Sequence, residues 1–387
     1  MIFAYLFHAF LYYLLYFPVQ IFCRIKFGFV PARPPKVKGP SLIVCNHNTD
    51  YDMLMVGTSF GRHMYFVGSE HIYRMGWVST LIRIVFAPIA RLKGSTDSSA
   101  AAAMLRALRS GRNVCVFAEG NRSFNGITNP IHPTIGKLAK VSRANLVVYR
   151  LEGGYFTSPR WSRTLRRGKM RSVVAGVFTA DELKDMTNQQ IHSAVTRLIH
   201  ENAYSVQDRV HTRYRGKRLA EGLEHIFFLC PKCRAIGSFT AEGDVCRCGK
   251  CGFSVRYTDY GYIAGTETSF RTVTQWDDWQ NEELNTLSQE NTEGDFFSDG
   301  GMTLRDVSGD HRSRILTEGT LAISRETLTV GDRSFSLGDI SQMTMYGPRT
   351  VVFSVGDAHY EIKCDHPCCT RKYLRMFELL TKRPVTI

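Results

Sequence analysis

Two short polar motifs, each placed directly after an apolar run, constrain the fold of this chain more than any other feature. Residues 42–45 are Leu-Ile-Val-Cys, and residues 46–52 continue as Asn-His-Asn-Thr-Asp-Tyr-Asp. Residues 113–116 are Asn-Val-Cys-Val, and residues 117–123 continue as Phe-Ala-Glu-Gly-Asn-Arg-Ser. Open α/β sheets keep their chemistry just beyond the carboxyl ends of buried strands. The two motifs therefore predict an α/β sheet with both polar segments at its carboxyl edge.

The first 220 residues alternate between strand-like and helix-like patterns, as an α/β domain requires. We expect strands at residues 42–45, 65–67, 84–89, 114–117 and 146–151. An alanine-rich helix is expected at residues 100–109, which are followed closely by Gly111. A capping box from Thr187 to Gln190 predicts a second helix, whose apolar residues share one face.

The first motif contains the parts of a general base. The unperturbed pKa of histidine is about 6.5, so His47 can accept a proton near neutral pH. A neighbouring carboxylate fixes the tautomer and stabilises the imidazolium, and both Asp52 and Asp50 are candidates for this partner. No serine or cysteine stands out as a covalent nucleophile, which favours direct attack by a substrate hydroxyl. The second motif supplies a glycine, an arginine and a serine, which suit an anion such as phosphate.

The order Asn-His-x4-Asp, then Phe-x-Glu-Gly-x-Arg-Ser, resembles the glycerolipid acyltransferase family, whose best-known members are the 1-acylglycerol-3-phosphate acyltransferases. The resemblance covers residues 38–200. In it, His47 and Asp52 match the catalytic pair. The residues that match the family's substrate-binding blocks are Arg91, Glu119, Gly120, Asn121, Arg122 and Ser123. The chain departs from the family pattern at Ala118 and Tyr149, where the family has proline, and at Asn121, where it has threonine.

The resemblance implies a membrane-associated enzyme that moves a fatty acyl group from a thioester to a lysophospholipid hydroxyl. The acceptor it implies is 1-acylglycerol-3-phosphate (lysophosphatidic acid), and the product is phosphatidic acid. The acyl donor is a thioester of coenzyme A or of acyl carrier protein. Arg91 and Arg122 are expected to hold the phosphate, and Glu119 to position an arginine or a substrate hydroxyl. The implied partners are membrane lipids and, with one of the two donors, acyl carrier protein, with no nucleic acid.

The N-terminal segment predicts a membrane anchor. Residues 1–23 contain no Asp, Glu, Lys or Arg, and Arg24 and Lys26 follow. The apolar length approaches the ~20 residues that span a bilayer, with the trailing positive charge on the cytoplasmic face. Pro18 and the many Tyr and Phe residues favour a helix lying in the interface instead. A buried core helix is a further alternative.

The positive charge indicates an anionic partner. The formal net charge is +14, and the excess lies N-terminal to Cys230. A basic run with Trp161 inside it either rests on anionic headgroups or forms a solvated loop. Its members are Arg160, Arg163, Arg166, Arg167, Lys169 and Arg171.

Four cysteines predict a structural zinc ribbon. Cys230 and Cys233 form one Cys-x2-Cys pair, and Cys248 and Cys251 form the other. Four thiolates close a tetrahedron around Zn²⁺ and leave no open position for catalysis. Cys246 is an alternative to Cys248. The remaining cysteines do not form a disulfide framework, which favours a reducing cytosolic environment.

The domains expected are a membrane helix at 1–30, an acyltransferase-type α/β domain at 31–225, a zinc ribbon at 226–265 and a small β-rich domain at 266–387. The last contains a helix at 275–287, a polar loop at 288–301 and short strands at 320–324, 351–355 and 359–362, and ends in a helix at 370–380. Two Gly-Asp pairs, at residues 331–332 and 356–357, suit hairpin turns. A PH-like barrel is the expected form of this domain.

Two other functions are compatible with the sequence. The first is a zinc-ribbon protein that binds lipid or nucleic acid without catalysis. The part that carries the ribbon is net acidic, which is the wrong sign for a phosphate backbone. The second is a lipid-binding module that has lost activity, against which the presence of His47, Asp52, Glu119 and Arg122 counts.

Overall fold

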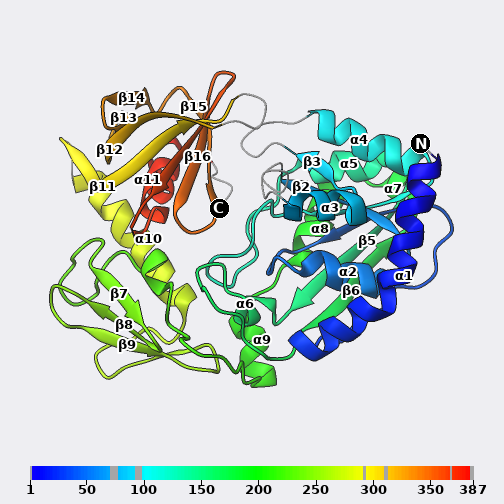
Figure 1. Ribbon diagram of the computed structural model, residues 1–387, viewed down its shortest axis with the longest axis horizontal. Coiled ribbons are helices and arrows are strands. Elements are labelled where there is room, and N and C mark those ends of the chain that lie inside the picture. Colours follow the sequence, from blue (N-terminus) through cyan, green and yellow to red (C-terminus); the bar gives the residue numbers. More distant parts are fainter. Residues whose placement is uncertain are drawn as a thin grey trace. The chain divides into compact units, whose positions relative to one another are not determined.

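The computed structural model describes residues 2–69, 77–91, 98–290, 293–308, 313–366 and 368–383. These residues form two compact units (Figure 1). The N-terminal unit comprises Met1–Pro159 and Arg166–Arg215, and the C-terminal unit comprises Arg160–Leu165 and Gly216–Ile387. The chain therefore leaves the first unit briefly at residue 160 and returns to it at residue 166.

The N-terminal unit contains a six-stranded sheet with the strand order β3-β2-β4-β1-β5-β6. All neighbours are parallel except β5 and β6, which are antiparallel. The strands are β1 (Ser41–Cys45), β2 (Met64–Ser69), β3 (Ile89–Arg91), β4 (Asn113–Phe117), β5 (Asn145–Glu152) and β6 (Arg171–Phe178). The central position of β1 explains its continuous apolar run, because a parallel strand covered on both faces is apolar on both.

Helices cover both faces of this sheet. Ile43 and Cys45 of β1 pack in one apolar cluster with residues of α1 and α2, while Leu42 and Val44 pack in another with residues of α4, α5 and α8. The helices are α1 (Ile2–Phe27), α2 (Asp52–Phe60), α3 (Trp77–Phe86), α4 (Ser98–Arg109), α5 (Thr134–Ser142), α6 (Gly154–Thr157), α7 (Ala180–Asp185), α8 (Asn188–Ile199) and α9 (Ala203–Val210). The predicted α/β domain with an N-terminal apolar helix is confirmed.

One predicted strand of this unit is wrong in part. Residues 84–86 form the last turn of α3, and only the residues from Ile89 onward are extended. The helix ends where Ala87 takes a positive φ of 38° before Pro88. A short apolar run does not distinguish a buried strand from a buried helix turn. The capping box at Thr187 and Gln190 is confirmed at the start of α8.

The C-terminal unit holds two antiparallel sheets. A four-stranded sheet has the order β10-β9-β8-β7, and a seven-stranded sheet has the order β14-β13-β12-β11-β17-β16-β15. The strands of the first sheet are β7 (Phe239–Glu242), β8 (Val245–Cys248), β9 (Ser254–Tyr257) and β10 (Ile263–Ala264). Those of the second are β11 (Asp295–Asp306), β12 (Arg314–Ser324), β13 (Thr327–Val330), β14 (Arg333–Ser336), β15 (Ile340–Tyr346), β16 (Thr350–Val355) and β17 (Ala358–Cys364). The predicted β-rich C-terminal region is confirmed.

Helices and turns of this unit agree with the sequence in most places. The helices are α10 (Val273–Glu290) and α11 (Arg371–Thr381), besides a short 3₁₀ helix, η2 (Leu223–His225). Both Gly-Asp pairs form hairpin turns, between β13 and β14 and between β16 and β17. Gly331 and Gly356 have φ values of 56° and 57°, which glycine adopts without strain.

Two further expectations are corrected. The polar loop expected at 288–301 is wrong, because α10 continues to Glu290 and β11 begins at Asp295. The basic run is not simply a surface loop, because Arg160, Trp161 and Arg166 are buried. Cys364 and Cys368 form a disulfide, which the sequence did not predict.

Candidate active site

His47 and Asp52 lie together just beyond the carboxyl end of β1. The Nδ1 atom of His47 is 2.9 Å from Oδ2 of Asp52. The two meet because α2 begins at Asp52, so residues 46–51 form a tight turn between strand and helix. The rival carboxylate, Asp50, is exposed and instead lies 3.3 Å from Nε of Arg122.

Asp52 is held by donors on both of its oxygens. Its side chain is fully buried, and Oδ2 accepts the backbone N–H groups of Asn48 at 2.6 Å and Thr49 at 2.9 Å. Oδ1 accepts the hydroxyl of Thr49 at 2.6 Å. A carboxylate fixed in this way orients the histidine and favours the tautomer with a proton on Nδ1. The other ring nitrogen, Nε2, then carries the lone pair that accepts a proton.

The ring of His47 is also fixed from one face. It stacks on Phe117, the last residue of β4, with ring centroids 4.6 Å apart and planes 21° apart. The side chain of His47 keeps 23% of its surface exposed. The ring is therefore anchored through Nδ1 and one face while part of it remains accessible to a substrate.

Glu119 of the second motif ties the two motifs together. Its carboxyl group is buried, Oε1 accepts the N–H of His47 at 2.6 Å, and Oε2 accepts the N–H of Asn129 at 2.6 Å. Burial raises the pKa of Glu119 to about 8, and the two backbone hydrogen bonds oppose that shift. Through these hydrogen bonds, Glu119 links the backbone of His47 to the backbone of Asn129. Its predicted role in positioning an arginine or a substrate hydroxyl stays a prediction.

The remaining residues of the second motif form a tight loop beside His47. Gly120 has a φ of 73°, a conformation that suits glycine. The N–H of Ser123 donates to the carbonyl of His47 at 3.0 Å, and the carbonyl of Asn121 accepts from the side chain of Asn129 at 3.2 Å. The side chain of Arg122 extends toward Asp50 and toward Ser158, whose carbonyl lies 3.4 Å from Nη1.

Arg91 lies at the end of the edge strand β3. Its side chain is exposed, and β2 and β4 separate β3 from β1 in the sheet. Residues 92–97, which follow it, lie outside the described residues. The predicted phosphate contact of Arg91 therefore stays a prediction.

A buried carboxyl group that the motifs did not indicate accepts hydrogen bonds from both neighbours of His47 in the sequence. Oε2 of Glu201 accepts Nδ2–H from Asn48 at 2.6 Å and from Asn46 at 3.0 Å. Burial raises the pKa of Glu201 to about 8, against hydrogen bonds from Asn48 and Gly153 that lower it. Asn46 and Asn48 flank His47 in sequence and were visible in the motif. Glu201, which follows α8, had no sequence signal.

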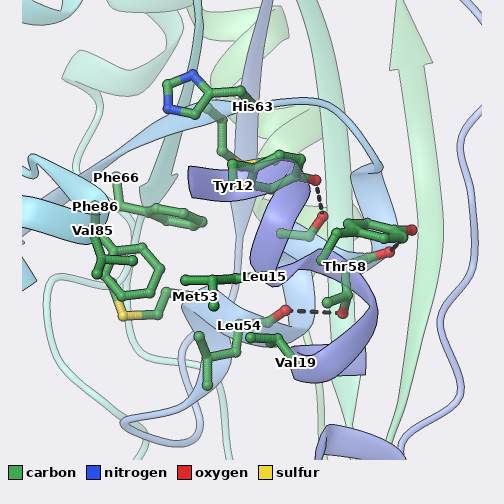
Figure 2. A pocket seen from close by; sticks show the side chains of 13 residues that line it. Tyr12, Leu15, Val19, Met53, Leu54, Thr58, His63, Phe66, Val85 and Phe86 are labelled. Atoms are coloured by element: carbon green, nitrogen blue, oxygen red, sulfur yellow. Dashed lines mark hydrogen bonds between the residues drawn. The ribbon is translucent and has the colours of Figure 1, made fainter. Parts of the chain in front are cut away.

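An apolar cavity lies next to the motif, between α1, α2, α3 and β2 (Figure 2). Met53, Leu54 and Gly57 of α2 line it, so its wall begins one residue after Asp52. Phe66 and Phe86 close the side opposite α1. His63 also lines it, and burial lowers the pKa of this histidine to about 4, so the ring is neutral at physiological pH. The cavity suits an uncharged, hydrocarbon-like group.

The four predicted zinc ligands gather in the C-terminal unit. The sulfur atoms of Cys230, Cys233, Cys248 and Cys251 lie within 4.8 Å of one another. Cys230 and Cys251 are 3.7 Å apart, and Cys233 and Cys248 are 3.8 Å apart. A tetrahedral zinc site with bonds of about 2.3 Å has sulfur–sulfur edges of about 3.8 Å, so the spacing fits. Cys246, the alternative ligand to Cys248, lies outside this group. The fourth candidate ligand is therefore Cys248.

Comparison with known proteins matches one segment of the chain to a family model. Residues 28–174 match the family model described as Acyltransferase. No curated protein matches the chain. One solved structure to which the chain is similar is the 1-acyl-sn-glycerophosphate (LPA) acyltransferase, PlsC, from Thermotoga maritima. The two are 15% identical, the match covers 48% of this chain and 77% of that one, and the TM-score is 0.39.

The matched region contains β1 to β5, so it includes both motifs, the His47–Asp52 pair and Glu119. The two motifs resemble those of the glycerolipid acyltransferase family, and the family match confirms this resemblance. The part of the chain at residues 28–174 therefore matches the acyltransferase family.

Proposed function

We propose that this protein transfers a fatty acyl group from an acyl thioester to the hydroxyl of a lysophospholipid at a membrane surface, with 1-acylglycerol-3-phosphate as the acceptor. The observation that carries the proposal is the His47–Asp52 hydrogen bond of 2.9 Å inside an acyltransferase-family domain. This pair is a general base, because Asp52 occupies Nδ1 and leaves Nε2 to accept a proton.

The reaction follows from this arrangement. Nε2 of His47 takes the proton from the acceptor hydroxyl while its oxygen attacks the thioester carbonyl carbon. Asp52 stabilises the imidazolium that forms. The carbon–sulfur bond then breaks, and the thiolate takes a proton from His47. The products are the new ester and a free thiol, and the histidine returns to its starting state. No covalent acyl-enzyme is needed.

Arg122 is the proposed phosphate ligand nearest to His47. Its side chain is mostly buried, whereas its ion-pair partner Asp50 is 73% exposed. An ion pair with an exposed partner contributes little to the stability of the folded protein. A phosphate group can therefore replace Asp50 beside the guanidinium. Arg91 is proposed as a second phosphate ligand on the strength of the family resemblance.

The apolar cavity between α1, α2 and α3 is the proposed site for part of an acyl chain (Figure 2). Its lining is hydrocarbon and aromatic, and it begins beside the residue that holds His47. Transfer of a methylene group from water to such a site is favourable by about 0.8 kcal/mol. The cavity therefore contributes to the binding of a fatty acyl group and to the selection of its length.

The helix α1 is the proposed membrane contact. Its Tyr5–Phe27 segment is long and apolar enough to cross a membrane by length and composition. However, Tyr12 and Tyr16 donate hydrogen bonds to the carbonyls of Gly57 and Thr58, and Phe27 is buried in the core. A helix held along the side of a polar domain cannot cross a bilayer without drawing that domain inward.

The opposite side of α1 exposes a continuous apolar stripe. We define this stripe by its members, which are Leu6, Phe7, Phe10, Tyr13, Leu14, Phe17, Ile21 and Ile25. Such a helix lies in the membrane interface with its apolar side toward the acyl chains. Arg24 and Lys26 at its end favour an anionic cytoplasmic leaflet.

The test is acyl transfer in liposomes that contain the purified protein. Lysophosphatidic acid and the neutral lipid monoacylglycerol are offered as acceptors, with coenzyme A and acyl-carrier-protein thioesters as donors. We expect phosphatidic acid from one or both donors, and we expect Arg122→Ala to raise the KM for lysophosphatidic acid but not for monoacylglycerol. An active protein that transfers equally to both acceptors, in both variants, would contradict the assignment of a phosphate-bearing acceptor.

A further inference from the structure

Glu201 lies outside the region that matches the acyltransferase family, yet its side chain is joined to the first motif. The match ends at residue 174, and Glu201 follows α8, which ends at Ile199. Its backbone is locked to the loop after the second motif, because the N–H of Thr128 donates to the carbonyl of Glu201 at 3.0 Å. The N–H of Glu201 donates in return to Oγ1 of Thr128 at 2.8 Å.

The two neighbours of His47 share this carboxyl group. Asn46 and Asn48 both donate from Nδ2 to Oε2 of Glu201, at 3.0 Å and 2.6 Å. Both also donate to the carbonyl of Leu151 on β5, and Oδ1 of Asn46 accepts the N–H of Leu151 at 2.7 Å. All these groups are buried. The side chains of the residues before and after His47 are therefore held by the same two acceptors, Oε2 of Glu201 and the carbonyl of Leu151.

His47 itself is fixed by different groups. Its N–H donates to Glu119, its carbonyl accepts from Ser123, and its ring bonds to Asp52. Asn48 connects the two sets, because its side chain bonds to Glu201 while its N–H bonds to Oδ2 of Asp52. That same oxygen accepts from His47. A shift of Asn48 therefore changes the geometry at the His47–Asp52 bond.

We propose that Glu201 is a positioning residue, which sets the orientation of His47 and Asp52 through Asn46 and Asn48. It touches neither substrate nor reacting atoms in this role. The inference rests on the proposed function for its effect on turnover, but its effect on the His47–Asp52 hydrogen bond stands independently of any substrate. Hydrogen-bond partners one step removed from a reacting group commonly tune its basicity and orientation.

The test combines a spectroscopic signature with kinetics on the full chain. The Nδ1–H proton of His47 is followed by nuclear magnetic resonance with ¹⁵N-labelled histidine, and the signal is assigned by its loss in His47→Ala. We expect Glu201→Ala to shift this signal. We expect kcat to fall about tenfold or more, with little change in KM, as for a loss of general-base efficiency. Glu201→Gln keeps one acceptor oxygen and should give a smaller shift.

Two further variants make the result decisive. Glu224→Gln is the matched control, because Glu224 is also a buried glutamate that accepts a backbone N–H, from Gly222 at 2.9 Å, but lies in the other unit. It should leave the His47 signal unchanged. Asn48→Ala should shift that signal, and combining it with Glu201→Ala should add little, because the two residues act through one contact.

An unchanged His47 signal in folded Glu201→Ala, or in Glu201→Gln if the alanine variant does not fold, would overturn the inference. Absence of acyl transfer by the wild type, with the signal shifted as expected, would instead count against the proposed function alone.

Discussion

His47 and Asp52 meet because the chain turns into α2 immediately after β1, which brings a carboxylate five positions away onto Nδ1 of the histidine. Sequence spacing alone predicted this pair, together with Asp50 as a rival. The structure separates the two carboxylates by burial, since Asp52 is enclosed and Asp50 is exposed. Glu201 could not be predicted in the same way, because the connection that follows α8 brings it to the motif from a distant part of the chain.

The carboxylate of Asp52 is expected to matter through orientation. Asp52→Asn keeps the size of the side chain but replaces an acceptor with a donor beside Nδ1. We expect kcat to fall by roughly 10²- to 10⁴-fold, the range that general acid–base catalysis contributes. The measurement is steady-state acyl transfer, with Asp181→Asn on the exposed surface of α7 as the control. Retention of more than a tenth of the activity in Asp52→Asn would contradict this role.

Glu119 and Glu201 make the stability of the N-terminal unit depend on pH. Burial raises the pKa of each to about 8 in the folded protein, above the ordinary value of 4.5. The folded state therefore holds protons that the unfolded state releases, and stability falls as pH rises from about 4.5 to about 8. Above about pH 8 these two groups add no further change.

Native-state hydrogen exchange on the amides of β1 and β4 measures this effect. We expect the opening free energy, corrected for intrinsic exchange rates, to decrease by on the order of 2 kcal/mol between pH 5.5 and 8. Glu119→Gln should weaken the dependence. An opening free energy that does not decrease over this range would contradict the raised pKa of both groups.

At the scale of elements, most of the alternation between strands and helices could be predicted, and the errors have physical causes. The apolar residues 84–86 belong to a helix turn because Ala87 and Pro88 end α3 there. The polar residues 298–301 lie inside β11, where the ladder to β12 shifts its register between Asp299 and Met302. The shift interrupts the alternation of apolar and polar residues, which is the main sequence signal of a strand.

The helix α2 is expected to set the acyl-chain preference. A Cβ at Gly57 would make ordinary contacts of 3.8 Å with Phe66 and 3.9 Å with Tyr12, so Gly57→Ala fits. Gly57→Leu would place a larger side chain in the cavity. We expect the leucine variant to shift the preference toward shorter acyl thioesters, while the alanine variant stays near the wild type. The measurement is competition between thioesters of several chain lengths. An unaltered preference in Gly57→Leu would place the acyl chain elsewhere.

The helix α1 is expected to hold the protein on membranes through its apolar stripe. Phe10→Glu combined with Phe17→Glu should sharply lower the fraction that sediments with anionic liposomes, because charged groups at these exposed positions oppose burial in the interface. Ile315→Glu, at an exposed position of β12, is the control and should bind like the wild type. Equal sedimentation of all three proteins would rule out the stripe as the membrane contact.

The cysteine group of the C-terminal unit is expected to bind one Zn²⁺ per chain as a structural ion. Cys233→Ser should lower the zinc content and the thermal stability of that unit, because a four-thiolate site contributes directly to folding. Cys246→Ser is the matched control, since Cys246 lies outside the group, and should keep the ion. The measurement is the zinc content per chain of each protein, by elemental analysis. Full occupancy in Cys233→Ser would show that the four sulfurs are not the ligand set.

At the scale of the whole molecule, the candidate active site and the candidate zinc site belong to different units. Both motifs, Glu201 and the apolar cavity belong to the N-terminal unit, while the zinc ligands and the seven-stranded sheet belong to the C-terminal unit. The sequence predicted a division of this kind from the cysteine spacing and from the change to short alternating strands. It did not predict that residues 160–165 join the second unit. There the buried Trp161 packs edge-on against Tyr257.

His47 is tested most directly as the base by single-turnover acyl transfer to lysophosphatidic acid, with the wild type and His47→Ala in the same liposomes. We expect phosphatidic acid from the wild type and none above background from the variant, with both proteins folded and equally bound to the membrane. Phosphatidic acid formed at similar rates by both proteins would contradict the assignment of His47 as the base.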